Sequence, residues 1–104
     1  IVVQHAPLEV QLRYLPLMQA AEQAGEIKSR HVALLEDRIR MYQNRPQIYG
    51  SQITVDSKTQ KMMLYAVEDP AHLDERRSRV GMVPASICAY LSSFTPQVEY
   101  EACK

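Results

Sequence analysis

Polar side chains concentrate between residues 45 and 52, where the sequence reads RPQIYGSQ. Gln47 and Gln52 offer amide donors and acceptors, Tyr49 offers a hydroxyl group, and Gly50 allows the backbone to come close to another group. A stretch of this kind could bind a polar ligand. It could equally be an ordered connection that docks the segment following it.

General-base chemistry is the second possibility that the side chains suggest. His5 could act as the base if a carboxylate fixed its tautomer, and Asp37 is a candidate for that carboxylate. Arg38 or Gln52 would then stabilise developing negative charge. These residues predict a hydrolase-like or transferase-like enzyme if they converge. Otherwise, His5 ties a helix junction together and Asp37 forms a structural ion pair with Arg38.

Arg76 and Arg77 form a small cationic pair whose guanidinium groups suit a carboxylate or a phosphate. The alternative is a solvated helix face. Taken with His5, Tyr49 and Gln52, the arginines predict a polar pocket in a binding or interaction domain, which recognises a small anionic ligand or an extended peptide end. A third hypothesis is an exported immunity or inhibitor protein, which is favoured only by the small size and by a possible disulfide bridge.

Composition excludes several other classes. The 104 residues carry 12 Lys and Arg against 12 Asp and Glu, and this zero net charge argues against nucleic-acid binding. Apolar runs are too short to span a membrane. Three scattered glycines and three single histidines provide neither a phosphate-binding loop nor a metal-ligand spacing. We therefore predict no metal and no cofactor, and the small-molecule or protein partner stays open.

The two cysteines, Cys88 and Cys103, enclose a short C-terminal loop. A disulfide between them would stabilise the fold by about 3 kcal/mol in the loop-closure model and would suit an oxidising compartment. This hypothesis predicts a periplasmic or secreted protein. The alternative is a cytoplasmic protein in which Cys88 is a core residue and Cys103 is a free thiol.

Two helices are predicted in the first half of the chain. Apolar residues spaced by three and four predict a helix over residues 7–24, in which Pro16 should introduce a kink or start a second helix. A second helix starts at Ser29 as its cap and ends before Pro46. Its expected buried stripe consists of Val32, Leu35, Ile39 and Tyr42.

The periodicity then changes to that of strands. Residues 53–55 and 61–67 flank a polar turn and predict a hairpin. Asp69 should cap a third helix that ends at Gly81, and Pro84 should open a fourth. The expected fold class is α+β, mainly α-helical with one small β-hairpin.

Four separated motifs resemble an uncharacterised bacterial domain family of unknown function: VQHA at residues 3–6, LEDRI at 35–39, RPQIYGSQ at 45–52 and EDPAHLDERRSRVG at 68–81. Family members usually carry more helical sequence before the first motif. The resemblance therefore implies that residues 1–104 are a single domain without its native N-terminal helical segment. It also implies one shared site, made of His5, Asp37, Arg38, Gln47, Tyr49, Gln52, Arg76 and Arg77.

Overall fold

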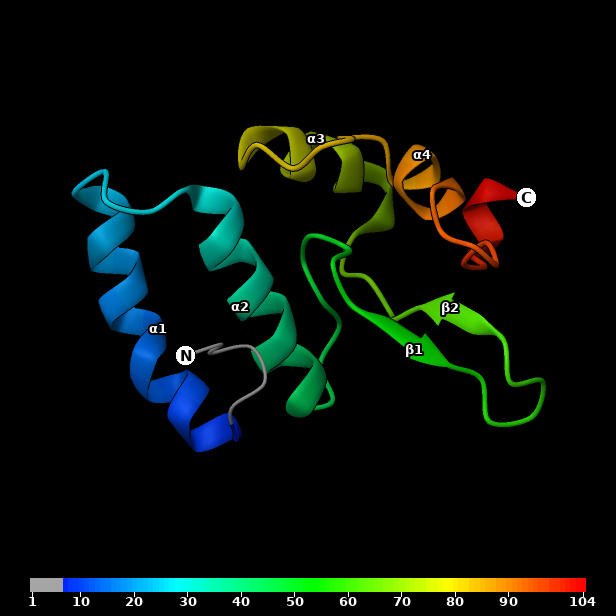
Figure 1. Cartoon of the computed structure of the whole chain (residues 1–104), viewed down its shortest axis with the longest axis horizontal. Coiled ribbons are helices and arrows are strands. Elements are labelled where there is room, and N and C mark those ends of the chain that lie inside the picture. The colour runs from blue at the N-terminus through cyan, green and yellow to red at the C-terminus, as the bar shows by residue number, and fades with distance from the viewer. Residues whose placement is uncertain (1–6) are drawn as a thin grey trace.

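The computed structural model describes residues 7–104. Two helices, α1 (Leu8–Gln23) and α2 (Ser29–Tyr42), lie side by side on one side of the molecule (Figure 1). No second helix starts at Pro16, because α1 continues through this residue, and that alternative of the prediction is wrong. Pro16 lies on the exposed side of α1, where water can bond the carbonyl group that loses its helical donor.

Helix α2 buries three of the four residues of its predicted stripe, namely Val32, Leu35 and Ile39. Tyr42 is instead 40% exposed, because it lies at the last position of the helix, beyond the packed region. The predicted Ser29 cap is also wrong. Lys28 occupies the N-cap position, and no side chain caps the helix.

The predicted hairpin is formed by β1 (Ile53–Val55) and β2 (Met62–Leu64), which pair antiparallel with Ile53 opposite Leu64. Asp56 closes the turn, since its Oδ1 accepts a hydrogen bond of 2.8 Å from the backbone N–H of Lys58. The free edge of β2 is covered by Glu99, whose backbone N–H donates to the Met62 carbonyl. The C-terminal segment thus extends the small sheet.

On the side opposite α1, the hairpin and the C-terminal half of the chain share a core (Figure 1). Here lie η2 (Pro70–His72), α3 (Leu73–Arg79), α4 (Ile87–Ser92) and η3 (Glu101–Cys103). The buried core residues are Leu64, Leu73, Ile87, Leu91 and Val98.

Two predicted helix starts need correction. Asp69 has a left-handed backbone, and its carboxylate contacts the Nδ1 of His72 at 2.9 Å instead of capping α3. Helix α4 begins after Pro84, and its cap is Ser86, whose Oγ accepts from the backbone N–H of Ala89. Ser86 supplies an oxygen acceptor at the cap position, which a proline lacks.

The predicted disulfide between Cys88 and Cys103 is present and joins α4 to η3. The predicted fold class, α+β and mainly helical with one hairpin, is confirmed. Among residues 7–104, no helix combines the length and the apolar character needed to cross a membrane.

Candidate functional site

Asp37 lies at the centre of the polar residues that the sequence singles out. It projects from α2 and is fully buried. Its Oδ1 accepts hydrogen bonds from the backbone N–H groups of Ile48 (2.8 Å) and Tyr49 (3.0 Å). Its Oδ2 accepts from the backbone N–H (3.1 Å) and the hydroxyl group (2.7 Å) of Ser51. All four acceptor positions of the carboxylate are therefore used to hold the loop.

Gln47 fixes the same loop from within. The side chain is fully buried, and its Oε1 accepts from the backbone N–H of Gln52 at 2.8 Å. Its Nε2 donates to the carbonyl groups of Gln52 (3.0 Å) and Tyr65 (2.9 Å). Because Tyr65 follows β2, this amide joins the loop to the hairpin.

Three arginines reach the loop from neighbouring helices. Arg38 donates to Oε1 of Gln52 at 2.9 Å. Arg76 donates through Nε to the carbonyl of Ile48 at 2.8 Å and also bonds the carbonyl groups of Glu68 and Asp69. We call this arrangement the loop clamp, and define it as residues 47–52 with Asp37, Arg38, Arg76 and Arg77.

Arg77 is the most buried member of the clamp that carries a positive charge. Only 2% of its surface is exposed, so the predicted solvated helix face is wrong at this position. Its guanidinium group donates to the carbonyls of Tyr49 (2.9 Å), Pro84 (2.8 Å) and Ala85 (3.0 Å). The guanidinium group also lies over the Tyr90 ring, with Cζ of Arg77 4.7 Å from the ring centre.

Burial shifts the pKa of both charged centres toward their neutral forms. Desolvation raises the pKa of Asp37, against the hydrogen bonds from Ser51, Tyr49 and Ile48. Desolvation lowers the pKa of Arg77 from its ordinary value, against the attraction of nearby acidic groups. Each group therefore holds a charge that the surrounding protein solvates less well than water does.

Two further groups show raised pKa values, Tyr49 within the clamp and Glu36 next to Asp37 on α2. Burial is the main cause for the hydroxyl group of Tyr49, and the charge of Glu36 adds to it. Glu36 itself has a raised pKa, chiefly from burial and then from the neighbouring charge of Asp37, while a hydrogen bond from Gln19 opposes the rise. The polar centre is thus partly shielded from water on several sides.

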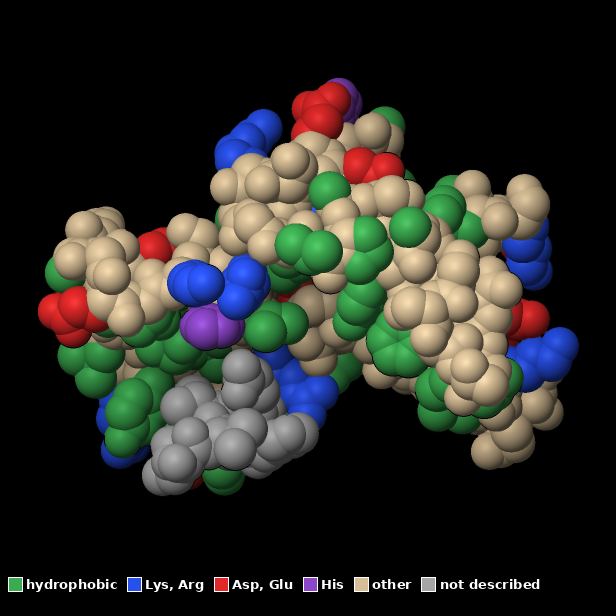
Figure 2. Space-filling view, turned by 45° about the horizontal axis from the view of Figure 1, so that its top comes forward, with side chains coloured by type: hydrophobic (Ala, Val, Ile, Leu, Met, Phe, Trp, Pro, Cys, Tyr) green, Lys and Arg blue, Asp and Glu red, His purple; other side chains and the backbone are tan. Residues whose placement is uncertain are grey.

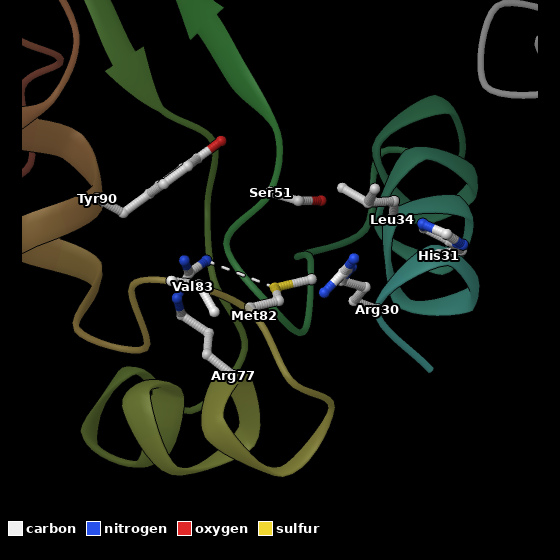
Figure 3. Close-up of a pocket in the computed structure, with 8 residues that line it drawn as sticks. All are labelled: Arg30, His31, Leu34, Ser51, Arg77, Met82, Val83 and Tyr90. Atoms are coloured by element: carbon white, nitrogen blue, oxygen red, sulfur yellow. Dashed lines mark hydrogen bonds between the residues drawn. The ribbon is translucent and has the colours of Figure 1, made fainter. Parts of the chain in front are cut away.

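A cleft of about 230 Å³ opens next to the loop clamp (Figure 3). From α2, Arg30 and Leu34 extend toward Ser51 and Met82. Figure 2 shows, on one face of the molecule, a histidine with basic and hydrophobic side chains beside it. The full lining of the cleft consists of Arg30, His31, Leu34, Ser51, Arg77, Met82, Val83 and Tyr90.

The charged residues in this lining are Arg30 and Arg77, both of them basic. Three other hollows on residues 7–104 each include the carboxylate of Glu99, whereas the cleft includes no acidic residue. No ion pair within residues 7–104 involves Arg30, His31 or Arg77. The cleft therefore combines an apolar wall with two arginines that form no ion pair within residues 7–104.

The structure gathers seven of the residues that the sequence predicts as one site: Asp37, Arg38, Gln47, Tyr49, Gln52, Arg76 and Arg77. Gln47, Tyr49 and Gln52 belong to one loop, and the other four residues bond to it. Of the seven, only Arg77 also lines the cleft. His5 lies outside the described residues, so its catalytic role with Asp37 and Arg38 stays a prediction. Other lining residues were not predicted from the sequence, namely Arg30, His31, Leu34, Met82, Val83 and Tyr90. The one feature of the sequence that could have pointed to the cleft was His31, an exposed residue in the first turn of the predicted helix that starts at Ser29.

A family model described as a family of unknown function (DUF6624) matches residues 1–94. The chain belongs to this family. The predicted membership of an uncharacterised domain family is thereby confirmed. The DUF6624 match ends before Cys103, so the disulfide joins the matched region to residues beyond it. Comparison with curated proteins and with solved structures finds no match.

Proposed function

We propose that this domain is a binding module that takes a small anion in the cleft between α2 and the α3–α4 connection. The observation that carries the proposal is that neither Arg77 nor Arg30 forms an ion pair within residues 7–104. The buried guanidinium of Arg77 bonds neutral carbonyl groups, and it lies in a cleft that also holds Arg30 and no acidic residue.

A bound anion would compensate this charge. At an effective dielectric constant of about 20, an anion about 6 Å from a guanidinium group gains roughly 3 kcal/mol of Coulomb energy. The cleft has about the volume of eight water molecules at roughly 30 Å³ each. It is smaller than pockets for drug-sized ligands, which start at about 300 Å³. These magnitudes support a ligand with few atoms.

Within this proposal, the loop clamp positions the cleft. Gln47 and Asp37 hold the backbone that carries Ser51, and Arg76 holds the same loop from α3. The ligand-binding roles predicted for Gln47, Tyr49, Gln52 and Arg76 therefore become positioning roles, in which these residues act on the ligand through Ser51 and Arg77.

We also propose that the protein works outside the reducing cytosol, in the periplasm or after secretion. The disulfide between Cys88 and Cys103 supports this location, because such bonds persist in oxidising compartments. The structure places this bond across the C-terminal segment, where it holds η3 against α4.

The test is a thermal unfolding series in which sodium acetate or sodium phosphate replaces sodium chloride at constant ionic strength. Binding to the folded state predicts a concentration-dependent rise in Tm for the wild type. Arg30→Gln should lose most of this rise. Arg13→Gln removes an exposed arginine on α1 outside the cleft and should keep it. No rise with either anion, or an equal rise in Arg30→Gln, would contradict the proposal.

A further inference from the structure

We infer that the ligand is a carboxylate attached to a short branched apolar group, an inference that rests on the proposed anion-binding function. The cleft has two unlike sides. Arg30 and His31 provide the basic part, while Leu34, Met82 and Val83 provide aliphatic surface. A ligand that fills the cleft must carry both a charge and an apolar body.

Hydrogen-bond accounting favours a carboxylate over a phosphate. The Arg77 guanidinium already donates hydrogen bonds to three carbonyl groups and to the sulfur atom of Met82. No hydrogen bond or ion pair within residues 7–104 uses the guanidinium group of Arg30. One guanidinium fork matches the two oxygens of one carboxylate. A phosphate would need more donors than the aliphatic wall can supply.

Val83 identifies the apolar part of the ligand. It is 84% exposed, the largest exposed fraction among the big hydrophobic residues of the described chain, and it lies beside the nearly buried Met82. One exposed valine is ordinary on a protein surface. At the cleft, however, it offers aliphatic surface that a small ligand can cover together with Leu34.

Two sources share this chemistry: a free branched-chain acid and the C-terminal residue of a peptide. Isovalerate is the probe for the first, and N-acetyl-leucine, which carries a peptide bond next to the carboxylate, is the probe for the second. Either probe is small enough for a cleft that holds about eight water volumes.

The experiment is isothermal titration calorimetry with isovalerate, isovaleramide, acetate, phosphate and N-acetyl-leucine. We expect isovalerate to bind about tenfold more tightly than acetate, because it also buries its branched group against Val83. Isovaleramide has the same shape without the charge and should not bind measurably. If N-acetyl-leucine binds more tightly than isovalerate, the source is a peptide end. Weaker binding indicates a free acid, and both results support the carboxylate class.

Variants separate the two parts of the ligand. Val83→Ser should weaken isovalerate about fivefold and leave acetate unchanged, whereas Arg30→Gln should weaken both. Val55→Ser is the matched control, because Val55 is another exposed valine (53%) that lies on β1, outside the cleft. Its binding should equal that of the wild type.

Failure of this inference is distinguishable from failure of the proposed function. Binding of acetate or phosphate that depends on Arg30, with no gain for isovalerate, overturns the branched carboxylate and keeps the anion site. Equal loss of isovalerate binding in Val83→Ser and Val55→Ser also overturns it. If none of the anions binds, both proposals are wrong.

Discussion

The loop clamp and the cleft lie against each other and share Ser51 and Arg77, yet they use their polar groups in opposite ways. In the clamp, the side chains of the buried Asp37 and Gln47 form hydrogen bonds with the protein's own backbone. In the cleft, Arg30 has no such bond within the described residues, and Val83 keeps its aliphatic surface in water. A dense polar motif can therefore mark a folded connection, while side chains that share no motif line the cleft.

Removal of the clamp's central acceptor tests this comparison with the largest effect. Asp37→Ala leaves the backbone N–H groups of Ile48, Tyr49 and Ser51 without their acceptor, and each unsatisfied buried donor costs about 1–3 kcal/mol. Relief of the buried charge offsets part of this cost. We expect a loss of about 4 kcal/mol in the free energy of unfolding, measured by urea denaturation with circular dichroism.

The matched control for that variant is Asp56→Ala, which removes a carboxylate that also accepts from backbone N–H groups, but in an exposed hairpin turn. Its cost should stay near about 1 kcal/mol, since water can replace the acceptor. If Asp37→Ala fails to fold, Asp37→Asn serves instead and should lose about 2 kcal/mol, because its amide NH2 replaces one acceptor oxygen and leaves at least one buried N–H group without an acceptor. A loss for Asp37→Ala no larger than that of Asp56→Ala would contradict the clamp.

Two glycines test how tightly the clamp packs on the core. Gly50 and Gly25 both have a positive φ, at +69° and +77°, so alanine is strained at either position. At Gly50 the new Cβ would also lie 3.0 Å from Cδ1 of Ile87, whereas nothing lies within 4 Å at Gly25. Thermal or urea unfolding should show a loss of about 1 kcal/mol for Gly25→Ala and about 3 kcal/mol for Gly50→Ala. An equal loss of unfolding free energy in the two variants would mean that the loop does not pack closely against the core.

The charge of Asp37 gives a smaller, pH-dependent signature. Because burial raises its pKa, the folded state binds its proton more tightly than the unfolded chain does. The stability that this proton contributes is fully present below the unfolded pKa, about 4, and is lost as the pH rises through the folded pKa. Asp37→Asn cannot titrate. Urea denaturation between about pH 4 and about pH 7 should therefore show wild-type stability falling relative to this variant, and a relative rise would reverse the sign of the shift.

The cleft should show almost no effect on stability. Arg30→Gln and Val83→Ser change side chains that make no internal hydrogen bond within residues 7–104, and Val83 is largely exposed. We expect the unfolding free energy to stay within about 0.5 kcal/mol of the wild type. A loss of about 2 kcal/mol or more for either variant would assign the cleft to the fold rather than to binding.

The fold was predictable where a periodic pattern of apolar residues defines a helix or a strand. Apolar spacing predicted α2, and alternation around Asp56 predicted the hairpin. Local sequence rules failed at Pro16, where no second helix starts, and at the cap of α2, because solvent exposure decides whether a helix tolerates a proline or an empty cap position. Such exposure depends on the packed structure and is not encoded by neighbours in the sequence.

The site was harder to predict for a related reason. The motifs brought Gln47, Arg76 and Arg77 together as one group, which the structure also does. Their bonds go to backbone groups, however, and no pattern of residue types encodes a carbonyl or an N–H that lies far away in the sequence. Arg30 and Val83 share no motif and meet only because α2 and the α3–α4 connection face each other across the cleft.

The most direct test of the central claim is a titration of the isotope-labelled protein with isovalerate, followed by two-dimensional amide NMR. The account predicts that the largest shift changes occur at residues 30–34 and at Met82 and Val83, while the amide signals of Gln47 and Ile48 stay close to their starting positions. Shift changes centred on Gln47 and Ile48, or no changes at all, would contradict it.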